Sequence, residues 1–284
     1  MFIRRNDGLG TVFLPFDVAA LLLAIWCTLW SGVHGAWVVP MMIGSWLGWF
    51  IALLLLYYFV VWLISLTVDT KAPPPAEDHP AYRRIVEDVI GMLCRFARVR
   101  IHFTGVEKLP EGRYLIVSNH RSGYDPITTV WALRGRRVAF ITKPENHKIP
   151  IAGPMIYKAN YLPIDREDPR KAMETIRAAA ALLKNDVVSV GVYPEGTRSR
   201  SGEMLPFHNG VFKIAQKANV PLAVASIRGT EKIKANFPWH ITDVYLHICE
   251  VLPPEAIQGA TSAVSDRVRE IIERDLAKAE LVLT

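Results

Sequence analysis

The sequence predicts an α/β fold, in which a largely parallel or mixed sheet is flanked by helices and preceded by an N-terminal membrane helical hairpin. Two observations carry this prediction. From Val99 onward, short apolar runs alternate with segments of helical spacing, as expected for strands and helices built around one sheet. Between Asp17 and Asp69 the chain contains no Asp, Glu, Lys or Arg, which makes this apolar segment too long for a buried core helix.

The charge-free segment consists of two apolar runs, Val18–Trp30 and Ala36–Leu66, separated by a turn-like break. The second run is long enough to span a bilayer with some tilt, whereas the first is short for a full span. The connecting residues carry no Lys or Arg, but basic residues flank the pair at Arg4, Arg5, Lys71, Arg83 and Arg84. The positive-inside rule therefore predicts that both ends face the cytoplasm, and the hairpin either spans the membrane or dips into one leaflet.

A proline-rich stretch at residues 71–75 predicts a stiff linker and a domain boundary. We expect an N-terminal membrane-anchoring hairpin over residues 1–70, a linker with an amphipathic helix over residues 71–98, and the α/β domain over residues 99–284. In the amphipathic segment, apolar residues recur at helical spacing from Tyr82 to Phe96, and charged residues take the other face. This helix either packs on the domain or lies at the membrane surface.

Within the α/β domain, apolar runs predict strands at Arg100–Thr104, Tyr114–Ser118, Val138–Thr142, Val187–Tyr193, Leu222–Ile227 and Val244–Val251. Helical spacing predicts helices at Ile127–Leu133, Arg170–Lys184, Gly210–Ala218 and Ala263–Ala279. If neighbouring strands run parallel, the polar loops that follow them meet at one edge of the sheet, where open α/β sheets bind their ligands.

The composition and net charge of the chain indicate which class of molecule it binds. The chain of 284 residues has a net charge of +6, but it contains no lysine- or arginine-rich run and no nucleic-acid motif. The basic excess therefore favours anionic lipid headgroups or an anionic substrate over nucleic acid. The three cysteines, at positions 27, 94 and 249, are scattered, and none forms a pair at metal-ligand spacing. Because three cysteines cannot all pair internally, we do not expect a disulfide framework, and a reducing cytosolic location fits.

The polar segment Asn119–Asp125, with the sequence NHRSGYD, directly follows the second predicted strand. His120 is expected at the end of the strand, and Asp125, followed by Pro126, in the first turn of a helix. A carboxylate there can accept a hydrogen bond from one imidazole nitrogen and leave the other nitrogen as a base. The pair alone is equally compatible with a simple turn, and metal binding is disfavoured because no third ligand stands at suitable spacing.

Two more polar segments follow predicted strands. In the one that begins at Tyr193, Arg198 can bind two oxygens of a phosphate, Glu195 can orient this arginine or accept a hydroxyl, and Gly196 allows close approach of the backbone. In the other, Lys143 supplies a second cation at the same expected edge. The alternative interpretations are a solvated loop with a local Glu–Arg pair and an ordinary exposed lysine.

Together these segments resemble the glycerolipid acyltransferases, the family typified by bacterial 1-acyl-glycerol-3-phosphate acyltransferase. The first has the family's N-H-x-S-x-x-D form, including Ser122, and residues 195–199 have its E-G-T-R-S form, including Thr197. A further block is matched by Lys143, Glu145, Pro150, Gly153 and Ile164-Asp165-Arg166. Val220-Pro221, followed by an apolar strand, is similar to the family's last block. The resemblance runs from about Val99 to Arg228, in order and at ordinary spacing, and the four blocks together are highly specific.

The resemblance implies that residues 99–284 form an acyltransferase domain. The implied reaction moves a fatty acyl group from acyl-CoA or acyl carrier protein to the free sn-2 hydroxyl of 1-acyl-glycerol 3-phosphate (lysophosphatidic acid), making phosphatidic acid. No metal and no cofactor beyond the acyl donor is implied. The implied setting is the cell inner membrane, with membrane lipids as partners and the domain on the cytoplasmic side.

The resemblance also assigns roles to residues. His120, oriented by Asp125, would be the general base, and Arg198 and Lys143 would hold the phosphate of the acceptor. The remaining site residues are Glu195, Gly196 and Thr197, which would belong to the substrate-binding segment, and Asn119 and Ser122, which would support the first segment. The tetrahedral intermediate needs oxyanion donors, for which backbone amides near Gly196 are candidates.

Some alternatives stay open. Asn146 and His147 stand where the family often carries apolar residues, so the preferred acceptor or acyl chain can differ. The acceptor can be another lysolipid, the same base can act on water in a hydrolase, or the protein can be a non-catalytic membrane lipid-binding protein. The sequence leaves the acyl-chain length, the donor carrier, the headgroup of the acceptor and the oligomeric state undecided.

Overall fold

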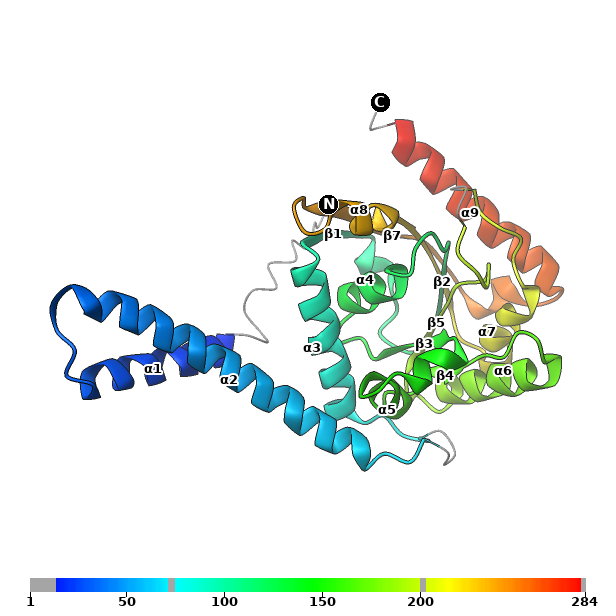
Figure 1. Ribbon diagram of the computed structural model, residues 1–284. Helices are drawn as coiled ribbons and strands as arrows, with labels where there is room; N and C mark the ends of the chain where they lie inside the picture. The colour runs from blue at the N-terminus through cyan, green and yellow to red at the C-terminus, as the bar shows by residue number, and fades with distance from the viewer. Residues whose placement is uncertain (1–13, 71–74, 200–202, 282–284) are drawn as a thin grey trace. The chain divides into compact units, whose positions relative to one another are not determined.

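The computed structural model describes residues 14–70, 75–199 and 203–281 (Figure 1). The chain divides into two compact units, one ending at Asp69 and the other continuing from Thr70. The basic residues Arg4 and Arg5, and residues 71–74 of the expected linker, lie outside the described residues.

The N-terminal unit is a pair of apolar helices, α1 (Leu14–Trp30) and α2 (Val38–Leu66), joined by a short connection. They pack on each other, and the Trp46 indole donates a hydrogen bond of 3.0 Å to the Asp17 carboxylate. By length and composition, the helical segment Gly35–Leu66 can cross a membrane, with a mean hydropathy of 2.4 and only 6% of its most apolar window buried. Large apolar side chains on both helices are exposed, which suggests association with a membrane.

The second unit is built around one sheet with the strand order β1-β7-β6-β2-β5-β3-β4. The strands are β1 (Val99–Thr104), β2 (Leu115–Ser118), β3 (Val138–Thr142), β4 (Leu162–Pro163), β5 (Ser189–Val192), β6 (Leu222–Arg228) and β7 (Thr242–Leu252). The five strands from β6 to β4 are mutually parallel, whereas β7 runs antiparallel to β6, and β1 pairs parallel with β7. The predicted α/β class with a largely parallel or mixed sheet is therefore confirmed.

Helices cover both faces of this sheet (Figure 1). They are α3 (Pro80–Phe96), α4 (Asp125–Ala132), α5 (Ala152–Lys158), α6 (Pro169–Lys184), α7 (Lys213–Ala218), α8 (Ile233–Asn236) and α9 (Thr261–Leu281). In Figure 1, α3 and α4 lie on one side of the sheet, and α6, α7 and α9 lie on the other. Burial from both sides explains why the central strand β2 is a continuous apolar run instead of an alternating one.

Three short elements were not predicted from the sequence, namely β4, α5 and α8. Each is too short to show a hydrophobic period of its own. The expected helix at Gly210–Ala218 is also shorter, because a 3₁₀ turn at Asn209–Phe212 precedes the α-helical part. These elements affect the site in one respect: the parallel β4 adds a fifth strand whose following loop reaches the same edge of the sheet as the loops after β2, β5 and β3.

Candidate active site

The loops after β2 and β5 meet at the carboxyl edge of the sheet, because the two strands are neighbours and run parallel. Two hydrogen bonds join the loops directly. The His120 amide donates to the Glu195 carboxylate at 2.6 Å, and the Ser199 amide donates to the His120 carbonyl at 3.0 Å. Segments that lie more than 70 residues apart in the chain therefore form one continuous surface.

A histidine–carboxylate pair lies at the centre of this surface. His120 Nδ1 lies 2.8 Å from Asp125 Oδ2, and because a carboxylate only accepts, the shared proton belongs to Nδ1. The same oxygen accepts from the amides of Arg121 and Ser122 at 2.7 and 2.8 Å. Asp125 is fully buried at the start of α4, where these amides and the helix N-terminus stabilise its negative charge.

A third strand contributes to the pair. The hydroxyl of Thr230, which is fully buried just after β6, donates to the other oxygen of Asp125. Asn119 ties the same strand to the loop of His120, since its amide group donates to the Ile227 carbonyl and accepts from the Ile227 amide, both at 2.9 Å. Thr230 was not identified as a site residue from the sequence. The available signal was its position three residues after the predicted strand Leu222–Ile227.

Stacked aromatic rings fix the plane of the imidazole. The ring of Tyr193 lies 4.4 Å from that of His120, and the ring of Phe140 stacks on Tyr193 at 5.5 Å. Burial raises the pKa of Tyr193 well above its ordinary value, and the nearby Asp125 charge adds to this rise, so the tyrosine stays neutral and donates to Thr129. Within the described residues, His120 Nε2 has no hydrogen-bond partner, which leaves it available to a substrate.

The remaining predicted residue of the first segment, Ser122, organises the turn. Its hydroxyl accepts from the Tyr124 amide at 3.2 Å, and its carbonyl accepts from the Asp125 amide at 3.2 Å. These local bonds hold the chain as it passes from the strand into α4. Ser122 therefore supports the loop that carries His120.

Glu195 is used differently from the substrate contact that the sequence suggested. Its side chain is buried, and its two carboxylate oxygens accept from the amides of His120 and Leu205 at 2.6 and 2.9 Å. Burial raises the pKa of this carboxyl, while the two amide hydrogen bonds oppose the rise. Glu195 therefore connects the loop that follows β5 to the loop of His120.

The glycine and the two exposed residues after Glu195 have distinct positions. Gly196 has a φ of +69°, and a Cβ atom there would lie 2.8 Å from the His208 ring. Its amide donates to the Tyr193 carbonyl at 3.0 Å, so this amide is not free for an oxyanion. Thr197 and Arg198 are exposed, and Arg198 Nη1 lies 3.3 Å from the position that a Cβ atom of Gly123 would occupy. The guanidinium therefore lies beside the loop of His120.

Two further cations belong to the same edge of the sheet. Lys143 is exposed directly after β3, which pairs parallel with β5. Among the described residues, no hydrogen bond or ion pair joins the Lys143 side chain to the loop of His120. Arg166 follows β4, and its Nε lies 3.7 Å from the position of a Cβ atom on Gly196. The Arg166 side chain therefore lies beside the loop that follows β5. The sequence placed Arg166 only at the end of a block that matches the family and did not predict this position.

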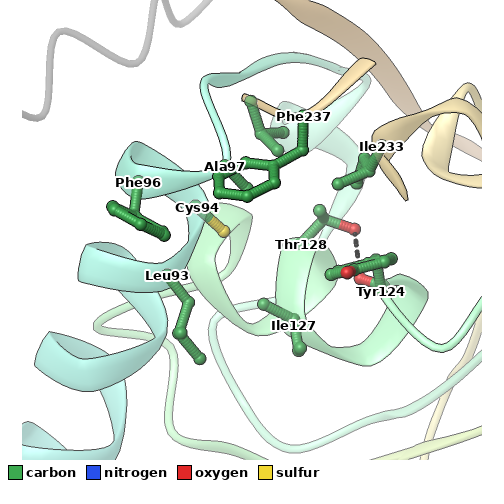
Figure 2. Close-up of a pocket in the computed structure, with 10 residues that line it drawn as sticks. Leu93, Cys94, Phe96, Ala97, Tyr124, Ile127, Thr128, Ile233 and Phe237 are labelled. Carbon is green, nitrogen blue, oxygen red and sulfur yellow. Dashed lines mark hydrogen bonds between the residues drawn. The ribbon is translucent and has the colours of Figure 1, made fainter. Parts of the chain in front are cut away.

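An apolar cavity lies beside the pair. It has a volume of about 200 Å³, and Figure 2 shows it between the end of α3, the start of α4 and the α8 region. Tyr124 and Thr128, which line it, flank Asp125 along the chain, and the Thr128 hydroxyl donates to the Tyr124 carbonyl at 3.0 Å. The rest of its lining comes from Leu93, Cys94, Phe96, Ala97, Val99, Ile127, Ile233 and Phe237.

The described residues contain no cluster of three or more His, Cys, Asp or Glu side chains that could hold a metal ion.

Comparison with known proteins shows which sequence family this part of the chain is similar to. Residues 100–228 match the family model described as Acyltransferase. The chain is 32% identical over 176 residues to human 1-acyl-sn-glycerol-3-phosphate acyltransferase alpha, covering 60% of this chain and 62% of the relative. It is 32% identical over 160 residues to 1-acyl-sn-glycerol-3-phosphate acyltransferase from Haemophilus influenzae, covering 56% and 63%. The aligned part thus spans less than two thirds of these relatives.

A solved structure supports the fold. The chain is similar to the 1-acyl-sn-glycerophosphate (LPA) acyltransferase PlsC from Thermotoga maritima, with a TM-score of 0.58 and 23% sequence identity. The similarity covers 93% of this chain and 97% of that chain. The region covered is therefore longer than residues 100–228, which match the family model.

Proposed function

The chain contains an acyltransferase-family domain over residues 100–228, and on that premise we propose that the protein acylates a lysophospholipid. The acceptor that we propose is 1-acyl-sn-glycerol 3-phosphate, whose free sn-2 hydroxyl would take a fatty acyl group from acyl-CoA or acyl carrier protein. The product would be phosphatidic acid. The observation that carries this proposal is the hydrogen-bonded pair of His120 and the buried Asp125, beside the loop that presents Arg198.

In the proposed reaction, His120 Nε2 removes the proton of the acceptor hydroxyl as its oxygen attacks the thioester carbonyl. The imidazolium that forms is stabilised by the Asp125 carboxylate on its other nitrogen. The tetrahedral intermediate then collapses, the carbon–sulfur bond breaks, and the imidazolium returns its proton to the leaving thiolate. The products are an ester and a free thiol, and no acyl-enzyme is required.

Cations at the edge of the sheet support an acceptor that carries a phosphate. The guanidinium of Arg198 lies beside Gly123, three residues after the proposed base, and Arg166 lies beside Gly196. An arginine fork binds two phosphate oxygens at once and fixes the orientation of the group. We propose that Arg198 holds the phosphate, with Lys143 and Arg166 adding positive charge, so that the hydroxyl is placed at His120.

Replacing Arg198 with alanine should raise the KM for lysophosphatidic acid by about 10- to 100-fold, the effect of losing one or two charge-assisted hydrogen bonds. The KM for the acyl donor should change by less than about twofold. Initial rates measured with each substrate varied in turn would test this. Arg177→Ala, which removes an exposed arginine from α6, is the matched control. An equal rise in both KM values would contradict the phosphate role of Arg198.

Purified protein in detergent would distinguish the proposed reaction from the alternatives. With oleoyl-CoA and a panel of lysolipids, acyl transfer releases thiol only when an acceptor is present. A hydrolase would release thiol without any acceptor, and a lipid-binding protein without turnover would release none. The panel also identifies the headgroup of the acceptor, since a phosphate-binding site should favour lysophosphatidic acid over neutral lysolipids.

We propose that residues 1–70 anchor the protein in the cell inner membrane, that residues 71–98 connect this hairpin to the catalytic part, and that residues 99–284 face the cytoplasm. The apolar helix within Gly35–Leu66 and the basic flanks of the hairpin support this arrangement. Both substrate and product would then be lipids of the same membrane.

A cysteine placed on α6 should report the side of the membrane on which the domain lies. In a variant without native cysteines, Glu174→Cys should resist a membrane-impermeant maleimide in intact cells and react after lysis, because Glu174 is exposed on the domain surface. Gel-shift detection of the modified fraction measures this. Equal modification before and after lysis would place the domain outside the cytoplasm.

A further inference from the structure

An exposed aromatic surface lies at one end of the second unit. We call it the aromatic patch and define it by Leu93, Phe96, Phe237, Trp239 and Ile241. Phe96 ends α3, and the last three residues lie between α8 and β7 or at the edge of β7. The side chains of Phe96 and Trp239 are 70% and 79% exposed, and the rings of Phe96 and Phe237 lie 5.2 Å apart. Figure 2 shows this ring pair from α3 and the α8 region.

Packing within the unit does not explain this patch. Elsewhere in the same unit, large apolar side chains are mostly buried in the core or half-buried at its margins. Trp239, which is four-fifths exposed and follows the exposed Phe237 by two residues, presents rigid apolar area to whatever lies outside. Aromatic side chains in this arrangement are typical of proteins that rest at the interface between lipid headgroups and acyl chains.

The rim of the patch is basic. Arg95 and Arg98 flank Phe96, and Lys232 and Lys234 precede Phe237; all four side chains are exposed. Over the described part of the chain, none of these four cations has an ion-pair partner. Of the acidic groups nearby, Asp243 pairs with His102 and Arg100, whereas Glu231, the residue before Lys232, is exposed and accepts from the neutral Gly229 amide. Unpaired cations around exposed aromatic rings complement an anionic lipid surface.

The apolar cavity described above reaches this patch. Phe96 and Phe237 belong both to the patch and to the lining of the cavity, and the lining continues to Tyr124, the residue before Asp125. An apolar path therefore runs from the exposed rings toward the histidine–carboxylate pair. If the patch faced water, this path would open into a solvent that disfavours acyl chains.

We propose that the aromatic patch is a membrane-contact surface of the domain itself, that its partner is an anionic lipid bilayer, and that it acts in addition to the N-terminal helices. The purpose of this contact, to let a lipid substrate reach His120 without crossing water, rests on the proposed function. The contact itself does not, because it can be measured without turnover. Trp239, Phe96 and Phe237 lie among the lipid headgroups, and the basic rim binds their phosphates.

A fluorescent label at the patch tests this contact in the full-length protein. In the variant without native cysteines, Trp239→Cys carries an environment-sensitive fluorophore, and Glu174→Cys on α6 carries the same label as a matched control. Both are reconstituted into vesicles of phosphatidylglycerol and phosphatidylcholine that contain a nitroxide lipid. Quenching by the nitroxide should be at least about threefold stronger at position 239 than at position 174, because only the first lies within reach of the bilayer.

The outcomes separate the possible occupants of the patch. Equal quenching at the two positions overturns the proposal, because the patch would then face water. A label at position 239 that neither the nitroxide lipid nor aqueous iodide quenches also overturns it, because protein would then cover the patch. Strong quenching in a preparation without acyl transfer would sustain the membrane contact while refuting the proposed function.

Variants of the rim test the role of charge. Lys232→Glu combined with Lys234→Glu should lower the rate with vesicle-borne acceptor by about fivefold or more, and the loss should shrink as the vesicles become neutral. The rate with a short-chain, water-soluble acceptor should stay within about twofold, since neither lysine touches the site. Arg177→Glu combined with Lys184→Glu, which reverses two exposed cations on α6, is the matched control. An equal loss with both acceptors would show that the rim acts on catalysis, against the proposal.

Discussion

Replacing His120 with alanine should reduce acyl transfer by about 10²- to 10⁴-fold, the usual range for the loss of a general base. The reduction should appear in kcat, because the side chain removes a proton in the transition state and contributes little to binding either substrate. Thiol release from oleoyl-CoA in the presence of lysophosphatidic acid measures it. Thermal unfolding should change little, since the imidazole is at the surface of the site and only Nδ1 is bonded within the protein.

The chain offers a matched control for this substitution. His102 also bonds an aspartate, with Nε2 lying 2.7 Å from Asp243, but it lies on the β1–β7 side of the sheet, away from the loops of the site. His102→Ala should therefore keep activity within about twofold, since surface substitutions away from a site have small effects. Activity retained by His120→Ala would remove the general base from the mechanism.

Replacing Asp125 with asparagine should lower kcat by about 10²-fold or more, through the loss of the charge that stabilises the imidazolium. The neutral amide oxygen can still accept from His120 and the two loop amides, and the amide nitrogen can donate to Thr230. The loop should therefore keep its shape, which circular dichroism and thermal unfolding would check. The expected effect separates the charge of Asp125 from its role in folding.

Two additional variants sharpen this result. Thr230→Val removes only the hydroxyl on the far side of the carboxylate and should cost less than Asp125→Asn. The double variant His120→Ala/Asp125→Asn should be no slower than His120→Ala alone, because groups that act as one unit are not additive. If the fold-reduction in rate of the double variant equalled the product of the two single reductions, Asp125 would act independently of His120.

Strong local signals explain how much of the fold could be predicted. The strands β2, β3, β6 and β7 were found near their observed bounds because each is a continuous or alternating apolar run, and burial selects such runs directly. The long helices α3, α6 and α9 repeat their apolar face over several turns. The two-residue β4 and the one-turn helix α8 were not found, because so few residues define no period.

For the site, the sequence identified residues but not all of their partners. His120 and Asp125 are five residues apart on a strand-to-helix turn, so the spacing alone predicts that they can bond. The contacts that set their geometry come from distant segments: Tyr193 stacks on the imidazole, and Thr230 bonds the carboxylate. The sequence suggested that Glu195 orients Arg198 or accepts a hydroxyl. Its bond to the His120 amide could not be predicted, because the two residues lie 75 positions apart in the chain.

The amino-acid sequence by itself determined the apolar N-terminal helices, the α/β class and the segments that carry the chemistry, because apolar periodicity and turn residues act over a few neighbouring positions. Only the tertiary structure decided the strand order, and with it which loops share an edge. That order placed β2 between β5 and β6, so that three loops distant in the chain contribute side chains to one pair. The tertiary structure also placed Phe96 beside Phe237. The sequence could not predict these arrangements, because pairing between distant strands and helices depends on the packing of the whole core and leaves no local pattern.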